Sequence, residues 1–95
     1  MTVYGVGQIT VTEPEAYGRY QARFMPVLIQ YGGRLLAADT APVVVDGEWP
    51  HQKFVLLAFP DEAAFHRWEQ SPEYQEIAKD RRAGAKGVVM MVRGI

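Results

Sequence analysis

The chain of 95 residues contains no cysteine, which excludes disulfides, thiolate metal sites and a cysteine nucleophile. A cysteine-free chain suits a reducing cytoplasm, where we expect this protein. Asparagine is absent as well, and serine occurs only once, as Ser71 directly before Pro72. A serine followed by proline is typical of a helix start, so we interpret Ser71 as a helix cap and not as an acyl-transfer nucleophile.

The chain also lacks an excess of positive charge, with 10 Lys and Arg against 11 Asp and Glu and a net charge of −1. Nucleic-acid binding needs a basic surface, so we expect no nucleic-acid partner. The opening residues 1–4 have no basic segment leading into a long apolar run, and we therefore expect no signal peptide. No window approaches the ~18 apolar residues that span a bilayer, so we expect no membrane partner.

Apolar residues are abundant, at 48%, and aromatic residues make up 12% of the chain. The length fits one domain over residues 1–95. A domain this small buries only about 60–65% of its unfolded surface. The core is therefore predicted to be small and rich in aromatic side chains.

The first half of the sequence predicts a strand, a helix and a second strand. Residues 3–11 form the strand, and Thr12 is expected to cap a helix that has Pro14 in its first turn. Pro26 predicts a kink or a break in that helix, and Gly32-Gly33 predicts its end, with one glycine in the left-handed conformation. The core-facing positions of the helix recur every three or four residues: Tyr17, Tyr20, Phe24, Val27, Leu28 and Tyr31.

After a strand at 34–39, the second half predicts another strand, a second helix in two segments and a last strand. A connection over 40–50, with a candidate short strand at 43–45, leads to a strand at 53–59. Asp61 is expected to cap the second helix, and Ser71-Pro72 to start a further helical segment before a last strand at 88–92. The inner positions of these helical segments are Ala64, Phe65 and Trp68, then Tyr74, Ile77, Ala78 and Arg81.

This order, strand–helix–strand–strand–helix–strand, predicts an α+β fold of ferredoxin-like type, with a four-stranded antiparallel sheet and both helices on one face. Residues 54–59 and 88–92 are apolar without alternation, which indicates strands buried on both faces. The face without helices would then be an exposed apolar patch. A second copy related by a two-fold axis is the simplest cover, so we predict a homodimer that pairs through the sheet into an α/β barrel.

Two patterns imitate functional motifs without completing them. Gly5-Val6-Gly7 resembles the start of a dinucleotide fingerprint, but the third glycine and a preceding strand are missing, so we interpret these glycines as a bulge or a close backbone approach. Glu62, His66 and Glu69 are spaced to share one helix face, and we interpret them as a solvated ion-pair face. We therefore predict no metal and no cofactor.

A ligand site is the remaining candidate, formed by Arg34, Arg81, Tyr20, Trp68 and Tyr74. The two guanidinium groups would hold a carboxylate-like anion, and the aromatic side chains would line a cleft between helices and sheet. The alternatives are that the aromatic residues are simply core, and that Arg34 pairs with Asp39 or Glu48 or faces solvent. No catalytic residue is assigned; a tyrosine or Glu48 would carry a proton if chemistry occurs.

Several short motifs follow one another in a fixed order over nearly the whole chain. They are Val11-Thr12-Glu13-Pro14-Glu15-Ala16-Tyr17, Tyr20, Tyr31-Gly32-Gly33-Arg34, Gly47-Glu48-Trp49-Pro50, Trp68, Ser71-Pro72-Glu73-Tyr74-Gln75 and Arg81. In these motifs the chain resembles an uncharacterised bacterial family known as domain of unknown function 1330. The resemblance implies a ferredoxin-like monomer that dimerises into an α/β barrel, and it brings no established substrate. Its wider superfamily includes cofactor-independent monooxygenases and heme-handling enzymes, but a chain without asparagine and with both histidines outside the motifs is a poor match to relatives that rely on those residues.

Two functions are therefore expected as alternatives. The first is a homodimer that binds a small aromatic or aliphatic carboxylate-like molecule, either as a plain binder or as an enzyme that needs no cofactor. The second is a non-catalytic structural or interaction module without a ligand. A cavity open to solvent and reached by Arg34 or Arg81 would favour the first, and a filled interior with both arginines in ion pairs would favour the second.

Overall fold

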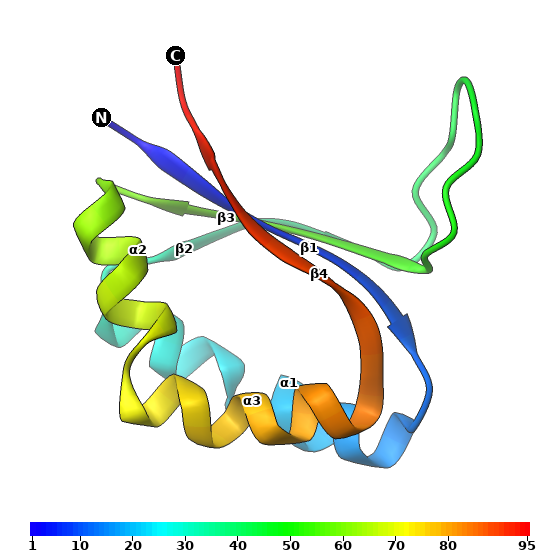
Figure 1. Cartoon of the computed structure of the whole chain (residues 1–95), viewed down its shortest axis with the longest axis horizontal. Helices are drawn as coiled ribbons and strands as arrows, with labels where there is room; N and C mark the ends of the chain where they lie inside the picture. The colour runs from blue at the N-terminus through cyan, green and yellow to red at the C-terminus, as the bar shows by residue number, and fades with distance from the viewer.

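The computed structural model describes all 95 residues and has the predicted order of elements. The sheet is antiparallel throughout, with the strand order β2-β3-β1-β4. All three helices lie on one side of the sheet (Figure 1). The elements are β1 (Val3–Val11), α1 (Pro14–Gln30), β2 (Arg34–Asp39), β3 (Lys53–Phe59), α2 (Glu62–Glu69), α3 (Pro72–Gly84) and β4 (Ala85–Arg93).

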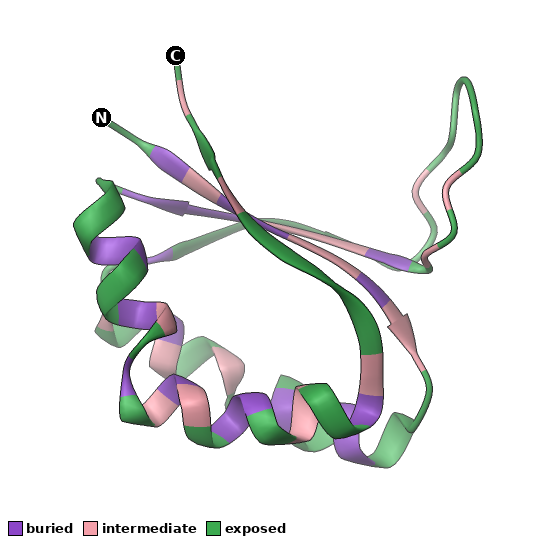
Figure 2. Ribbon diagram, in the orientation of Figure 1, coloured by how far each residue is buried: buried purple, intermediate pink, exposed green.

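The core lies between the sheet and the helices, and the outward faces of the helices are exposed (Figure 2). Its largest fully buried side chains are Trp68, Phe59, Leu28, Ile77 and Val3. The inner positions predicted for α2 and α3 are confirmed, except that Arg81 is only partly buried. No helix in the chain is both long enough and apolar enough to cross a membrane.

The predicted caps of α2 and α3 are confirmed. The Asp61 carboxylate accepts a hydrogen bond from the Ala64 amide at 2.8 Å. The Ser71 hydroxyl accepts one from the Tyr74 amide at 3.0 Å and donates to the Trp68 carbonyl at 2.7 Å. Ser71 therefore joins the end of α2 to the start of α3, which fixes the angle between the two helices.

The start of α1 differs from the prediction. Thr12 does not cap the helix; the capping position is Glu13, whose side chain makes no capping bond. The Thr12 and Glu13 amides instead donate to the carbonyl of Gly84, at 2.9 and 3.0 Å. The last residue of α3 thus accepts the hydrogen bonds of the two amides that precede α1. The start of α1 is therefore fixed by a tertiary contact and not by a side-chain cap of its own.

The expected break at Pro26 is absent, because α1 is helical from Pro14 to Gln30. Both Pro26 and Ala22, whose carbonyl loses its donor, are exposed. That carbonyl lies on the solvent side, where water satisfies it, and the helix tolerates the proline. The predicted end is confirmed, since Gly32 has φ of 79°.

The connection between β2 and β3 contains no strand, so the candidate strand at 43–45 is wrong. Its valines pair with no neighbouring strand, and Val43 and Val45 are 88% and 94% exposed. The loop projects from the side of the sheet opposite the helices (Figure 1). Its base is held to β1 by the Trp49 indole, which donates to the Gln8 side chain at 3.0 Å, and by His51, 3.0 Å from the Thr10 hydroxyl.

The face of the sheet away from the helices is largely uncovered, as predicted. On β4, the side chains of Val88, Met90 and Val92 are 48%, 39% and 44% exposed. They lie opposite Gln8, Val6 and Tyr4 in the register of β1. We call this surface the open face: residues 4, 6 and 8 of β1 with residues 88, 90 and 92 of β4.

Gly84 provides a stability test of the contact between α1 and α3. A Cβ at Gly84 would lie 2.5 Å from the Tyr17 amide nitrogen, so we expect Gly84→Ala to lower the free energy of unfolding by roughly 1–3 kcal/mol. Gly18 of α1 has open space around its Cα, and Gly18→Ala should raise that free energy by about 0.5–1 kcal/mol. Urea unfolding of both variants checks this. Equal stability of the two alanine variants would contradict the close contact between Gly84 of α3 and the backbone of α1.

Candidate ligand pocket

A pocket of about 200 Å³ lies between the helices and the sheet, and 13 of its 18 lining residues are hydrophobic. The sheet side of the pocket includes Gly5 and Gly7 of β1. A Cβ at Gly7 would make only ordinary contacts, at 3.6 Å or more, so the missing side chain leaves room for a ligand. Exposed residues of α1, β2 and β4 also line the pocket and mark it as open to solvent: Gln21, Met25, Leu35, Ala38 and Val89.

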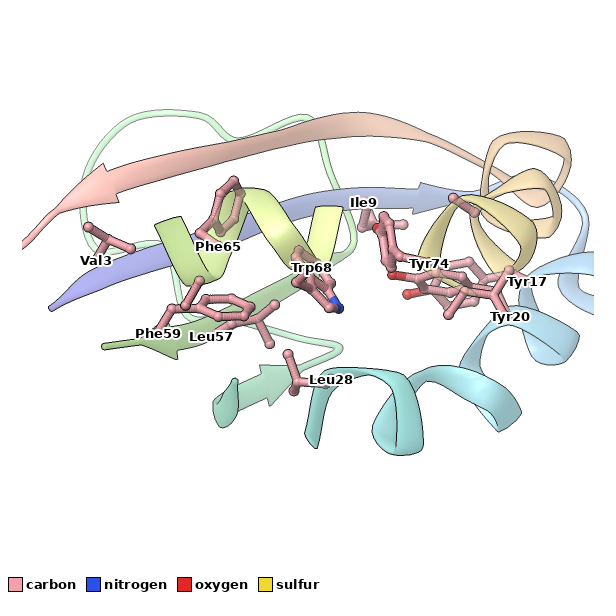
Figure 3. Close-up of a cluster of buried hydrophobic side chains, with 13 residues drawn as sticks. Val3, Ile9, Tyr17, Tyr20, Leu28, Leu57, Phe59, Phe65, Trp68 and Tyr74 are labelled. Carbon is pink, nitrogen blue, oxygen red and sulfur yellow. The ribbon is translucent and has the colours of Figure 1, made fainter. Parts of the chain in front are cut away.

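Four of the five predicted ligand residues line this pocket: Tyr20, Trp68, Tyr74 and Arg81. The Tyr20 and Tyr74 hydroxyl oxygens are 3.2 Å apart, and the Trp68 and Tyr74 ring centroids are 4.2 Å apart. Figure 3 shows the Trp68 nitrogen on the side of the ring that faces the tyrosines. These aromatic residues, for which the sequence left core packing and cleft lining as alternatives, are buried and border the pocket.

Arg34 does not line the pocket. It is the first residue of β2, it is exposed, and it makes no ion pair with Asp39 or Glu48. In the register it lies opposite Ala58, whose neighbours Leu57 and Phe59 belong to the core, so Arg34 is on the side of the sheet away from the helices. Glu48 is exposed in the loop after β2 and does not line the pocket either.

Two buried hydrogen-bond donors of the pocket have no acceptor within the protein. They are the indole nitrogen Nε1 of Trp68, a residue only 1% exposed, and Nε of Arg81. An unpaired buried donor costs free energy, which is why almost all such groups in folded proteins are paired. Both of these lie in the same pocket.

Lys53, at the start of β3, is a pocket residue that the sequence analysis missed. It is 8% exposed, makes no hydrogen bond or ion pair, and holds its ammonium group 5.0 Å from the centroid of the Tyr17 ring. Burial lowers the pKa of this amine from its ordinary value of 10.5. Strand alternation contained the signal, because Lys53 shares its side of β3 with Leu57 and Phe59.

Two tyrosines of the pocket, Tyr17 and Tyr20, are held in their neutral form. Burial raises the pKa of Tyr17 and Tyr20, with a smaller opposing effect from the positive charge of Arg81. The hydroxyls of Tyr20 and Tyr74 bond only to each other, so one of their two protons has no acceptor. No carboxylate lines the pocket, which therefore presents hydrogen-bond donors in excess of acceptors.

The carboxylates of α2 belong to a separate, exposed surface. Glu62 pairs with Arg93 through two bonds of 3.1 Å, and His66 lies 3.4 Å from Glu69. The interpretation of this face as ion pairs is confirmed. The structure contains no group of three or more side chains suited to a metal ion.

The strand order and the one-sided helices define a ferredoxin-like α+β domain. The chain belongs to the family called Domain of unknown function (DUF1330), whose model matches residues 2–95. The predicted family and fold are both confirmed. No curated protein matches the chain.

Solved structures from bacteria share this fold. A protein of unknown function from Rhodopseudomonas palustris is similar with a TM-score of 0.81 and 19% identity, over 99% of this chain and 82% of that one. The cofactor-independent oxygenase SnoaB from Streptomyces nogalater is similar with a TM-score of 0.69 and 18% identity, over 99% of this chain and 93% of that one. A dimeric ferredoxin-like protein of unknown function from Jannaschia has a TM-score of 0.66 and 18% identity, over 99% of this chain and 100% of that one.

Lys53→Met tests the energetic cost of the buried amine. At pH 7 we expect the free energy of unfolding of this variant to be about 1 kcal/mol higher than that of the natural chain, because methionine fills the same space without a desolvated charge. Between the lowered pKa of the folded state and 10.5, the unfolded chain binds more protons, so the stability of the natural chain rises with pH. The advantage of the variant should therefore shrink as the pH approaches 10.

Urea unfolding of both chains, at one protein concentration and at two pH values, measures this difference. Lys79→Met is the matched control, since Lys79 is exposed and pairs with Glu76 at 2.9 Å. A Lys53→Met variant less stable than the natural chain would show that the amine is stabilising where it lies.

Proposed function

We propose that this protein is a homodimer that binds a small, mainly apolar anion, such as an aromatic or aliphatic carboxylate, in the pocket of each protomer. One observation carries the proposal: a largely apolar pocket has Arg81, Lys53 and the Trp68 indole along its wall, and no acceptor within the protein meets them. A carboxylate supplies negative charge and several acceptor positions, and an apolar body fills the rest of the pocket.

The alternative, an interaction module with a filled interior, accounts less well for these groups. Such a module gains nothing from burying an indole N–H and an amine without partners, and each of them costs stability. In a ligand site the same cost is offset when the ligand arrives. The absence of an ion pair at Arg81 favours the ligand site for the same reason.

Benzoate is a suitable probe of this proposal. We expect it to raise the melting temperature of the natural chain, and we expect Arg81→Met to weaken its binding at least about tenfold, because a charge-assisted hydrogen bond is lost. Arg34→Met is the matched control, since it removes the same group outside the pocket, and it should bind as the natural chain does. Calorimetric titration gives the affinities.

Two further variants of this experiment locate the probe. Gly7→Val adds a side chain whose Cβ makes only ordinary contacts and whose methyl groups would occupy the pocket, and it should abolish binding while the chain stays folded. Trp68→Phe removes the indole donor together with part of the ring, keeps an aromatic side chain, and should weaken binding by a smaller factor. Binding that survives Gly7→Val, or that Arg34→Met weakens as much as Arg81→Met, would refute the proposed site.

The dimer is proposed from the open face. Val88, Met90 and Val92 form an exposed apolar row along β4, and such a row calls for a partner. The loop between β2 and β3 projects from the same side, with exposed valines that extend the surface beyond the sheet (Figure 1). The protein from Jannaschia is dimeric, which supports a dimer here.

Light scattering at micromolar concentration tests this dimer. We expect the natural chain to have twice the mass of its 10.7 kDa protomer, and Met90→Asp to have the protomer mass, because a charge cannot be buried in the apolar interface. Ile29→Asp is the matched control: Ile29 is 64% exposed on α1, away from the sheet. A natural chain that runs as a monomer would refute the dimer.

A further inference from the structure

We propose that Lys53 is a nucleophile which forms a Schiff base with the carbonyl carbon of an oxo acid, a molecule that carries both a carbonyl and a carboxylate. This inference rests on the proposed pocket and adds a covalent step to it. The carboxylate would lie against Arg81, and the carbonyl would face the Lys53 amine.

Lys53 differs from the other two lysines of the chain in its surroundings. Lys79 and Lys86 are exposed, whereas Lys53 is 8% exposed and lines the pocket. Lys79 is also held by Glu76. The three lysines thus form an internal comparison, because only one of them combines burial, access to a cavity and freedom from a carboxylate.

The side chains that line the pocket together with Lys53 include no carboxylate. From α1 the pocket receives Tyr17 and Tyr20, and from α3 it receives Tyr74 and Arg81. None of these is a carboxylic acid that would hold the amine as an ammonium ion, and burial lowers the pKa of the amine. A buried amine in an apolar pocket, without a carboxylate partner, is the kind of lysine that attacks a carbonyl.

The step is balanced without an oxidant or a reductant. The lone pair of the amine forms a bond to the carbonyl carbon, and the carbonyl electron pair moves to oxygen. One proton passes from nitrogen to that oxygen and gives a carbinolamine. The hydroxyl then takes a second proton from the solvent, to which the pocket is open, and leaves as water, so that amine and carbonyl become a protonated imine. The neutral phenols of the pocket are suited to donate to the carbonyl oxygen as charge develops on it.

Reductive trapping tests this proposal with a defined probe. The natural chain is incubated with 4-carboxybenzaldehyde and cyanoborohydride, which reduces an imine to a stable amine. Peptide mass spectrometry then measures labelling of Lys53, Lys79 and Lys86 separately. At neutral pH we expect Lys53 to be labelled at least about tenfold faster than the other two, because the carboxylate of the probe binds in the pocket and holds the aldehyde beside this amine.

Three controls separate this inference from the proposed pocket. Lys53→Arg keeps the charge and should lose only the fast labelling, with Lys79 and Lys86 unchanged. Excess benzoate should slow labelling of Lys53 alone, because it occupies the pocket without reacting. Benzaldehyde, which lacks the carboxylate, should label Lys53 more slowly than the carboxylated probe does.

The outcomes are distinct. If benzoate binds in the pocket and Lys53 is labelled no faster than Lys79, the nucleophile is refuted and the pocket stands. If Lys53 is labelled fast but benzoate neither binds nor protects it, the nucleophile stands and the anion site is refuted. If fast labelling persists in Lys53→Arg, it belongs to another amine and the inference fails.

Discussion

The structure depends on one constraint: a four-stranded sheet carries all of its helices on the same side. The covered side receives enough aromatic side chains to build a core, and the uncovered side keeps the valines of β4 in contact with solvent. No helix or strand of the structure covers the second side, so its apolar row is open to a partner. The pocket and the open face therefore lie on opposite sides of one sheet, and a molecule can bind at one without displacing what covers the other.

Inside the covered layer, the packing is complete at one end and incomplete at the other. Phe59, Phe65 and Trp68 pack closely where α2 meets the sheet, with ring centroids 5.2–5.7 Å apart. Towards the tyrosines of α1 and α3, the glycines of β1 leave space, and the groups that border this space are donors without acceptors. A core selected for stability alone would fill such a space with an aliphatic side chain and avoid the desolvated amine. The same stretch of sheet thus serves stability at one end and recognition at the other.

The sequence was sufficient where local chemistry decides the structure. The caps at Asp61 and Ser71 and the turn at Gly32 follow from short motifs, and they were predicted correctly. Thr12 failed as a cap because the distant carbonyl of Gly84 binds the amides next to it, a contact that no local pattern contains. Lys53 was missed because a lysine at the start of a strand is ordinarily exposed. Only its spacing from Leu57 and Phe59, by even numbers of residues, shows that it lies on the buried side of β3. Arg34 was predicted to be a ligand residue but does not line the pocket. Its motif correctly marks the start of a strand, but the alternation of side chains along β2 places Arg34 on the side of the sheet away from the pocket.

Two physical effects oppose each other at Lys53, and their balance decides what the pocket can do. The face of the Tyr17 ring attracts an ammonium ion, whereas removal from water disfavours the charge. Lys53 has no carboxylate partner in the protein, so the amine can change its protonation state without breaking an ion pair. An entering carboxylate restores the charged form and makes the amine an anchor, while an entering carbonyl consumes the neutral form and makes it a nucleophile. The chemistry of the ligand therefore selects between the two roles, and Arg81, which stays charged in both, supplies the fixed point against which a ligand is oriented.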